Sequence, residues 1–167
     1  KQDSPIKALA DLAGATVAFP SPNALGASLL VRADLQRLHG VVFTPLYVQT
    51  HSSVYLHVAL GLAAAGGGVM STLESQPPEI RNGLRILYKT REMAPHPITA
   101  HPRVPPVDRE RVRRALIEMG QTAEGRALLE KVPMREVVAA SIDDYLPLKD
   151  WGLETLYEPP AAAEIGK

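Results

Sequence analysis

The first half of the chain alternates between short apolar runs and stretches with apolar residues at helical spacing. Residues 16–19 form a run of β-favouring side chains, which predicts a buried strand. A turn rich in proline, serine and asparagine follows at 20–23. The next apolar residues recur at helical spacing: Leu29, Leu30, Ala33 and Leu38. They predict a helix that ends at the glycine stop of His39 and Gly40.

The same order of strand and helix continues along the chain. Residues 42–48 predict a second strand, in which Pro45 favours a position at the edge of a sheet or at a bulge. The remaining elements are a helix over 53–65, a short strand over 66–70, a helix over 72–75 and a fourth strand over 84–89. Strands that alternate with helices predict an α/β fold, here a three-layer α/β/α lobe with a mainly parallel sheet.

Small polar residues near the helix starts predict side-chain caps. Ser21 or Asn23 is expected to cap the first helix. Ser52 is expected to cap the second, and Ser71 the third. A capping side chain accepts a hydrogen bond from an N–H group of the first turn, so the caps decide which of these donors stay free.

The second half of the chain begins with a proline-rich connection and then becomes helical. Helices are predicted over 107–119 and 122–131, the second of them capped by Thr122. A cap signal at Ser141 starts a last segment that runs to Gly152. The proposed lobe therefore carries additional helices at its C-terminal end.

Length and composition bound what the chain can be. Its 167 residues fit one domain, which we expect to be a single α/β lobe with C-terminal helices over 1–158, followed by a flexible tail over 159–167. Lys and Arg total 18, as do Asp and Glu, so the net charge of zero argues against a nucleic-acid surface or a polybasic membrane patch. Cysteine is absent, which excludes disulfides and thiolate catalysis.

The turn between the first strand and its helix is the strongest candidate site. Ligands of open α/β sheets bind at the carboxyl ends of strands, and the free N–H groups of a helix start favour an anion. These rules place a small-anion site on residues 23–28. The glycine run at 66–68 lacks the Lys and Ser/Thr of a P-loop and predicts close backbone packing instead. No Gly-x-Ser-x-Gly elbow is present, and we expect no catalytic residue, metal or cofactor.

Several stretches together resemble the second lobe and C-terminal helices of a type II periplasmic substrate-binding protein. The most similar branch serves ABC transporters for phosphate, phosphite and phosphonate. The stretches are 9–19, 22–35, 50–59, 65–69, 73–81 and 96–102, which together cover most of residues 6–155. The resemblance implies a periplasmic-binding-protein type II-like fold, and a chain that is a fragment of a two-lobe protein.

The resemblance also implies a set of site residues. A Ser-Thr-Ser triplet of the family falls on Ala24, Leu25 and Gly26, so backbone N–H groups remain as donors at the first turn. The family's second-turn histidine falls on His51, and an acidic residue of aminophosphonate binders falls near Val69. The predicted ligand-binding residues are Asn23, Ala24, Leu25, Gly26, Ser28, Thr50, His51, Ser52 and Val69.

Function follows from the same resemblance. It implies a non-catalytic solute-binding component of an ABC transporter for a small oxyanion, phosphate- or phosphonate-like, in the periplasm or another extracytoplasmic space. The implied partner is the membrane permease. Two alternatives stay open: an extracytoplasmic sensing domain of a signalling protein such as a histidine kinase, and a scaffold whose site has decayed. An isolated lobe exposes its cleft face, so we also expect a homodimer through that face.

Overall fold

The computed structural model describes residues 1–132, 134 and 136–159. Contacts divide the chain into a first unit, residues 1–92 with 148–167, and a second unit, residues 93–147. The lobe expected over 1–158 stays a prediction. Of the expected tail, residues 160–167 lie outside the described residues.

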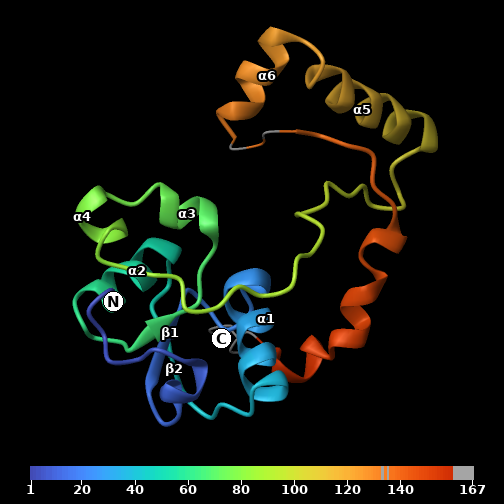
Figure 1. Cartoon of the computed structure of the whole chain (residues 1–167). Helices are drawn as coiled ribbons and strands as arrows, with labels where there is room; N and C mark the ends of the chain where they lie inside the picture. The colour runs from blue at the N-terminus through green and yellow to red at the C-terminus, as the bar shows by residue number, and fades with distance from the viewer. Residues whose placement is uncertain (133, 135, 160–167) are drawn as a thin grey trace, which may run out of the picture. The chain divides into compact units, whose positions relative to one another are not determined.

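The first unit contains a small sheet with helices around it (Figure 1). The strands are β1 (Thr16–Phe19), β2 (Thr44–Tyr47) and β3 (Ala65–Gly66), and the helices are α1 (Leu30–Ala33), α2 (His51–Ala59), α3 (Met70–Glu74) and α4 (Pro78–Arg81). Segments of 3₁₀ helix lie at Leu9–Leu12, Leu146–Trp151 and Leu153–Leu156. Wider π-type turns, Leu25–Leu29 and Asp34–Leu38, flank α1 directly. Together they form one continuous helix, named here helix 25–38.

β1 is the central strand of the sheet and coincides with the strand predicted at 16–19. The strand order is β2-β1-β3, and both pairs are parallel. Phe19 at the end of β1 lies opposite Tyr47 at the end of β2. β2 is an edge strand, as Pro45 predicts, because proline has no N–H group to donate to a second neighbour.

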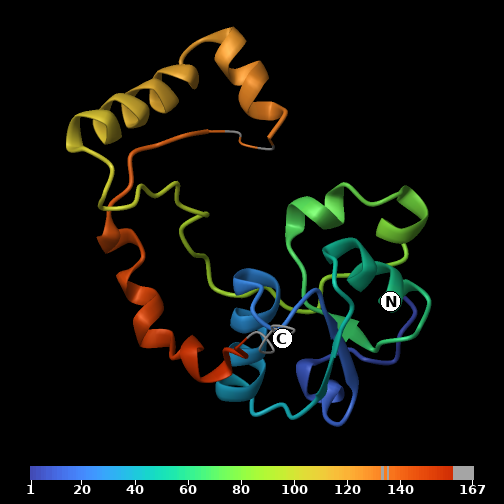
Figure 2. The same cartoon turned by 180° about the vertical axis from the view of Figure 1, so that it is seen from behind.

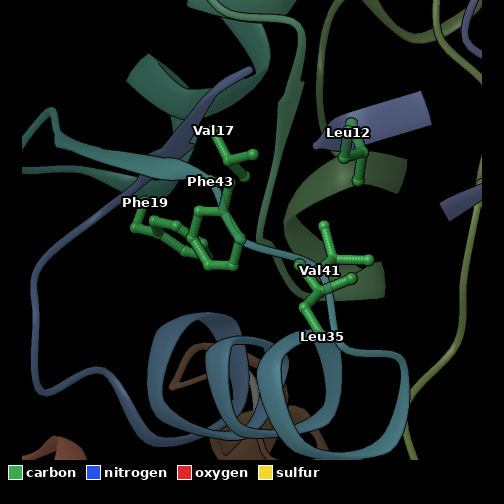
Figure 3. Packing of buried hydrophobic residues seen from close by; sticks show 6 residues of the cluster. All are labelled: Leu12, Val17, Phe19, Leu35, Val41 and Phe43. Atoms are coloured by element: carbon green, nitrogen blue, oxygen red, sulfur yellow. The ribbon is translucent and has the colours of Figure 1, made fainter. Parts of the chain in front are cut away.

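One face of β1 builds the main core of the first unit (Figure 3). Val17 and Phe19 point to this face, and the Phe19 ring centre lies 5.8 Å from that of Phe43. The buried residues of this cluster are Leu12, Val17, Phe19, Leu35, Val41 and Phe43. Leu35 comes from helix 25–38, so this helix covers this face of the sheet. Each fully buried Val, Leu or Phe side chain stabilises the fold by about 1.5–3 kcal/mol.

The other face of β1 is covered by α2. Ala18 points to this face and packs with Val54 and Val58 of α2 and with Ala63. Ala18 and Val54 are fully buried, and the small alanine lets the helix approach the strand closely. Helices therefore cover both faces of a parallel sheet, and the predicted three-layer α/β fold is confirmed.

The predicted fourth strand over 84–89 is wrong. These residues form no strand pairing, although Leu87 packs against the main cluster and Leu84 against the cluster on the other face. Packing against the two clusters buries these leucines in part, and such packing does not require strand pairing. The short strand predicted over 66–70 is also misplaced, because β3 comprises Ala65 and Gly66 only.

Helix 25–38 lacks the predicted side-chain cap. It begins after Ala24, whose backbone is extended and whose side chain makes no capping bond. Neither Ser21 nor Asn23 is the N-cap, and the amide of Asn23 bonds to Glu158 instead. The N–H groups of the first turn are therefore not used by a cap.

The caps of the next two helices also differ from the prediction. Thr50 caps α2, since its Oγ1 accepts from the Ser53 N–H at 3.1 Å, and Ser52 lies inside the helix. α3 begins after Val69 with no side-chain cap, so Ser71 lies inside that helix. In both cases the chain leaves its strand earlier than the sequence suggested.

The second unit contains the two helices predicted for it, α5 (Pro106–Met119) and α6 (Ala123–Glu130), which pack side by side (Figure 2). Thr122 caps α6, and Ser141 caps a 3₁₀ turn at Ile142–Asp144. Both capping predictions are confirmed.

Candidate functional site

The parallel strands direct three turns to the same edge of the sheet, where their carboxyl ends lie. The first and third of these turns are in contact. A Cβ atom at Gly26 would lie 3.9 Å from Val69 Cγ1. A Cβ atom at Gly67 would lie only 2.1 Å from the carbonyl oxygen of Ala27, which shows how closely the backbones approach. The structure thus brings together the predicted site residues of these two turns.

α2, which follows the second turn, is tied to the third turn and to α3. Tyr55 Oη donates to the carbonyl oxygen of Val69 at 2.7 Å, and burial raises the pKa of this phenol. Gln76 Nε2 donates to Ser52 Oγ at 3.2 Å. These side-chain bonds hold the turn after β3 beside α2.

The first turn of helix 25–38 offers backbone donors. Its first internal bond runs from the Ser28 N–H to the Ala24 carbonyl oxygen at 2.8 Å. The N–H groups of Leu25, Gly26 and Ala27 precede it and have no acceptor within the helix. Neighbouring N–H groups at the positive end of a helix dipole suit a small anion.

Two residues of the predicted set carry buried polar atoms that lack a hydrogen-bond partner. They are Ser28 Oγ and His51 Nδ1, and within the described part of the chain no other buried side-chain nitrogen or oxygen is in this state. Ser28 is 0% exposed. His51 is the first residue of α2. A buried polar atom without a partner costs about 1–3 kcal/mol, so native proteins rarely keep one.

The other predicted side chains are engaged or apolar. Thr50 Oγ1 lies 2.7 Å from Ser53 Oγ in addition to capping α2, and Ser52 Oγ accepts from Gln76. Ala24, Leu25, Gly26 and Val69 have only backbone polar groups to offer. The polar groups of the set that the protein does not already use are therefore those of Ser28, His51 and the first-turn backbone.

Asn23 is engaged by the C-terminal end of the chain. Its Nδ2 donates to the carbonyl oxygen of Glu158 at 2.5 Å, and its Oδ1 accepts from the Glu158 N–H at 2.9 Å. Both amide atoms are thus bound to the backbone of one residue 135 positions away. The structure assigns Asn23 an anchoring role that the sequence did not suggest.

Sequence reasoning missed Arg32, Tyr47 and Glu158. The Arg32 guanidinium lies 3.1 Å from Glu158 Oε1, and Tyr47 Oη donates to the same oxygen at 2.7 Å. Arg32 is 7% exposed, unusually buried for an arginine. A local pattern could not have found this cluster, because 126 positions separate Arg32 from Glu158.

Because of Tyr47, we expect the free energy of unfolding of the first unit to fall at alkaline pH. Burial and the hydrogen bond to Glu158 raise the pKa of Tyr47 to about 12. An unfolded tyrosine titrates near pH ~10, so the stabilisation is fully present below that pH and is lost as the pH rises to about 12. We expect the late part of a phenolate absorbance titration to lose one phenol in Tyr47→Phe. An unchanged curve for Tyr47→Phe would show that its proton is not held in this way.

Other kinds of site find no support in the described residues. No group of three His, Cys, Asp or Glu side chains there could hold a metal ion. No described helix is long and apolar enough to cross a membrane. A depression of about 410 Å³ lies between residues 1–6 and 58–64. It lies at the opposite edge from the three turns, since Ala64 donates to Thr16 at the start of β1.

Comparison with known proteins identifies the class. The family model "ABC transporter, phosphonate, periplasmic substrate-binding protein" matches residues 1–145. The chain therefore belongs to this family, as the sequence motifs predicted. A search of curated proteins gives no match. Among solved structures, XAC2383 from Xanthomonas citri, bound to chloride ion, is similar with a TM-score of 0.71 and 17% identity over 93% of this chain.

The solved structure supports the fold, and the family model supports the class of protein. At 17% identity the XAC2383 structure shows the shared fold alone, and the present chain covers 63% of its length. The family consists of periplasmic, non-catalytic binding components of transporters, so the expectation of a non-enzyme is confirmed at that level. Neither comparison supports the expected homodimer.

Proposed function

We propose that this chain binds a small oxyanion, phosphate- or phosphonate-like, at the turns that follow β1 and β2, as part of the binding component of an ABC transporter. The proposed donors are the N–H groups of Leu25, Gly26 and Ala27, the hydroxyl of Ser28 and the ring of His51. Their role is to hold and enclose the ligand without changing it. Family membership supports the transport setting.

The unpartnered pair of Ser28 Oγ and His51 Nδ1 carries this proposal. Each follows a different strand, and both strands end at the same edge of the sheet. Because buried polar atoms in native proteins are almost always paired, two such atoms at this edge favour a polar ligand as their partner. The free N–H groups of the adjacent helix start make an anion the best fit.

The replaced triplet bears on the ligand class. The side chains of Ala24, Leu25 and Gly26 supply no hydroxyl donor, and each hydrogen bond to a charged group is worth about 1.5–3 kcal/mol. A ligand here depends on backbone donors and on one or two side chains. Among phosphate- and phosphonate-like oxyanions, this favours the small or less highly charged ones over a phosphonate dianion that needs many donors.

A thermal-shift panel tests the site directly. The panel contains phosphate, phosphite, methylphosphonate, aminoethylphosphonate, sulfate and simple carboxylates, and the variants are His51→Ala, Gly26→Pro and the control His96→Ala. Proline is tolerated in a first helical turn but removes one N–H donor. We expect one anion class to raise the Tm of the wild type and the control, with no shift in the two site variants. No shift in the wild type, or an equal shift in the site variants, would contradict the proposal.

Ser28→Ala gives a sharper prediction, because its two effects have opposite signs. Removing a buried hydroxyl without a partner should raise the free energy of unfolding by about 1 kcal/mol in the absence of ligand. Losing one hydrogen bond to a charged ligand should weaken binding about 10-fold or more. Urea denaturation measures the first effect, and calorimetric titration with the best anion of the panel measures the second.

The exposed Ser75 provides the control for this variant. Ser75→Ala is expected to leave both stability and affinity within error of the wild type, because surface substitutions change stability little. If Ser28→Ala lowered stability and left affinity unchanged, the hydroxyl would be a structural group and the anion site would lose its main support.

The partner is proposed from the family alone. The family delivers its ligand to a membrane permease, which favours transport over the sensing alternative. A permease gene beside this one would support that partner. A kinase domain in the same gene product would instead support the sensing domain.

A further inference from the structure

The C-terminal strap, residues 151–158, lies along helix 25–38 of the first unit, where both views show it beside α1 (Figures 1 and 2). Arg37, near the end of the helix, donates to the carbonyl oxygens of Trp151 at 2.6 Å and Gly152 at 2.9 Å. The strap is thus fixed at the C-terminal end of the helix and runs antiparallel to it.

The other end of the strap is held at the start of the helix. Arg32 Nη2 and Tyr47 Oη both bond to Glu158 Oε1, at 3.1 and 2.7 Å. Arg32 is itself positioned by a bond of 3.1 Å to the carbonyl oxygen of Pro22, and its guanidinium carbon lies 5.8 Å from the centre of the Tyr47 ring. A cation and a phenol therefore face the same carboxylate oxygen.

Burial differs sharply between the two charges of this pair. The Arg32 side chain is 9% exposed, whereas that of Glu158 is 47% exposed. A buried guanidinium without a counter-ion is strongly unfavourable, so Arg32 needs an anion beside it. The carboxylate of Glu158, which is the more exposed of the two groups, is that counter-ion.

The backbone of Glu158 is recognised as well. Asn23 donates to its carbonyl oxygen and accepts from its N–H, which is how a neighbouring strand binds an extended peptide. The preceding residue, Tyr157, has an extended backbone. Asn23 thus binds the backbone of Glu158, while Arg32 and Tyr47 bind its side chain.

We propose that Asn23, Arg32 and Tyr47 form a recognition site for an acidic residue in an extended peptide, and that the chain's own Glu158 occupies it. The site is distinct from the proposed oxyanion site, because its cation lies further along helix 25–38 and its occupant is part of the chain. Since Asn23 precedes the N-cap Ala24, an occupied site also fixes the start of the first ligand turn.

Chemical rescue of the full chain tests this proposal. Glu158→Ala empties the carboxylate position, and sodium propionate supplies a carboxylate of similar shape, with sodium chloride at the same ionic strength as the control salt. We expect Glu158→Ala to lower the Tm by about 4–8 °C, and propionate but not chloride to restore part of the loss. The exposed Glu154 of the same strap gives the matched variant Glu154→Ala, which should melt within about 1 °C of the wild type.

Whether propionate acts by binding Arg32 is tested in the Arg32→Met background. There Glu158→Ala should cause little further loss, and propionate should have no effect, because the cation is gone. Equal Tm values for Glu158→Ala and Glu154→Ala, or equal rescue by chloride and propionate, would overturn the proposal. Should Glu158→Ala fail to fold, Glu158→Gln decides: a Tm lowered only when Arg32 is present supports the site, and an unchanged Tm contradicts it.

Discussion

Replacing Gly67 with alanine is expected to lower the free energy of unfolding by about 3 kcal/mol, among the largest effects of any single methyl group in this chain. The new Cβ atom would lie 2.1 Å from the Ala27 carbonyl oxygen and 2.7 and 2.8 Å from two carbons of the Phe19 ring. Neither neighbour can easily move, because one is helix backbone and the other is a fully buried ring in the main core.

The expected loss corresponds to a Tm lower by about 6–12 °C, which a thermal denaturation scan resolves readily. Gly26→Ala is the matched control, since its Cβ atom would meet Val69 Cγ1 at an ordinary contact distance of 3.9 Å. We expect that variant to melt within about 2 °C of the wild type. Similar Tm values for the two variants would show that the turn after β3 and helix 25–38 do not approach as closely as described.

Similarly close contacts explain why the two neighbouring positions are also glycine. A Cβ atom at Gly66 would meet Val54 of α2 at 2.4 Å, and one at Gly68 would meet Tyr55 Oη at 2.2 Å. Successive glycines thus face different neighbours, as alternation along an extended segment requires. The sequence correctly predicted close packing from the missing P-loop residues, but it could not name the neighbours.

Much of the first unit could be predicted because its signals are local. β1 contains the β-favouring residues Thr16, Val17 and Phe19, and Pro45 in the second strand pointed to the sheet edge that it occupies. The segment over 84–89 shows the limit of that logic. Leu84 and Leu87 are partly buried against the two clusters, whereas Ile86 is exposed, and strand pairing depends on a partner with free backbone groups, which composition does not reveal.

The candidate site divides in the same way. Strand order and helix start predicted the position of the candidate anion turn and with it Ser28, whereas His51 was selected from the family resemblance. That Ser28 Oγ is buried and unpartnered follows only from tertiary packing. Asn23 was selected for the same turn, but its amide is used by Glu158, and no spacing rule connects residues 135 positions apart.

Asp34 and Arg91 form the ion pair whose disruption we expect to destabilise the first unit most. It is a carboxylate with 0% exposure on helix 25–38, and it accepts from Arg91 at 2.5 Å and from Tyr88 Oη at 3.1 Å. Arg91 is the better solvated partner, with 36% of its side chain exposed and its guanidinium stacked 4.4 Å from the centre of the Trp151 ring. This cluster fixes the last residues of the first unit before the chain leaves for the second.

Removing either member of a buried ion pair leaves the other uncompensated. We expect Asp34→Ala to lower the free energy of unfolding by about 3 kcal/mol, because the remaining arginine can regain water. Arg91→Met should cost up to about 5 kcal/mol, because it leaves a fully buried carboxylate with the Tyr88 hydroxyl as its donor. Urea denaturation measures both, and Trp151, the single tryptophan, reports fluorescence from within the first unit.

An exposed pair supplies the control. Arg113 and Glu110 also bond, at 2.9 Å, but their side chains are 55% and 47% exposed, and Arg113→Met should leave the free energy of unfolding close to the wild-type value. The double variant Asp34→Ala with Arg91→Met should lose clearly less than the sum of its single losses, since the second substitution removes a charge already left without its partner. Additive losses would mean that the two side chains stabilise the fold independently, and the anchoring of residues 88–92 would then have to come from Tyr88 and from the stacking of Arg91 on Trp151.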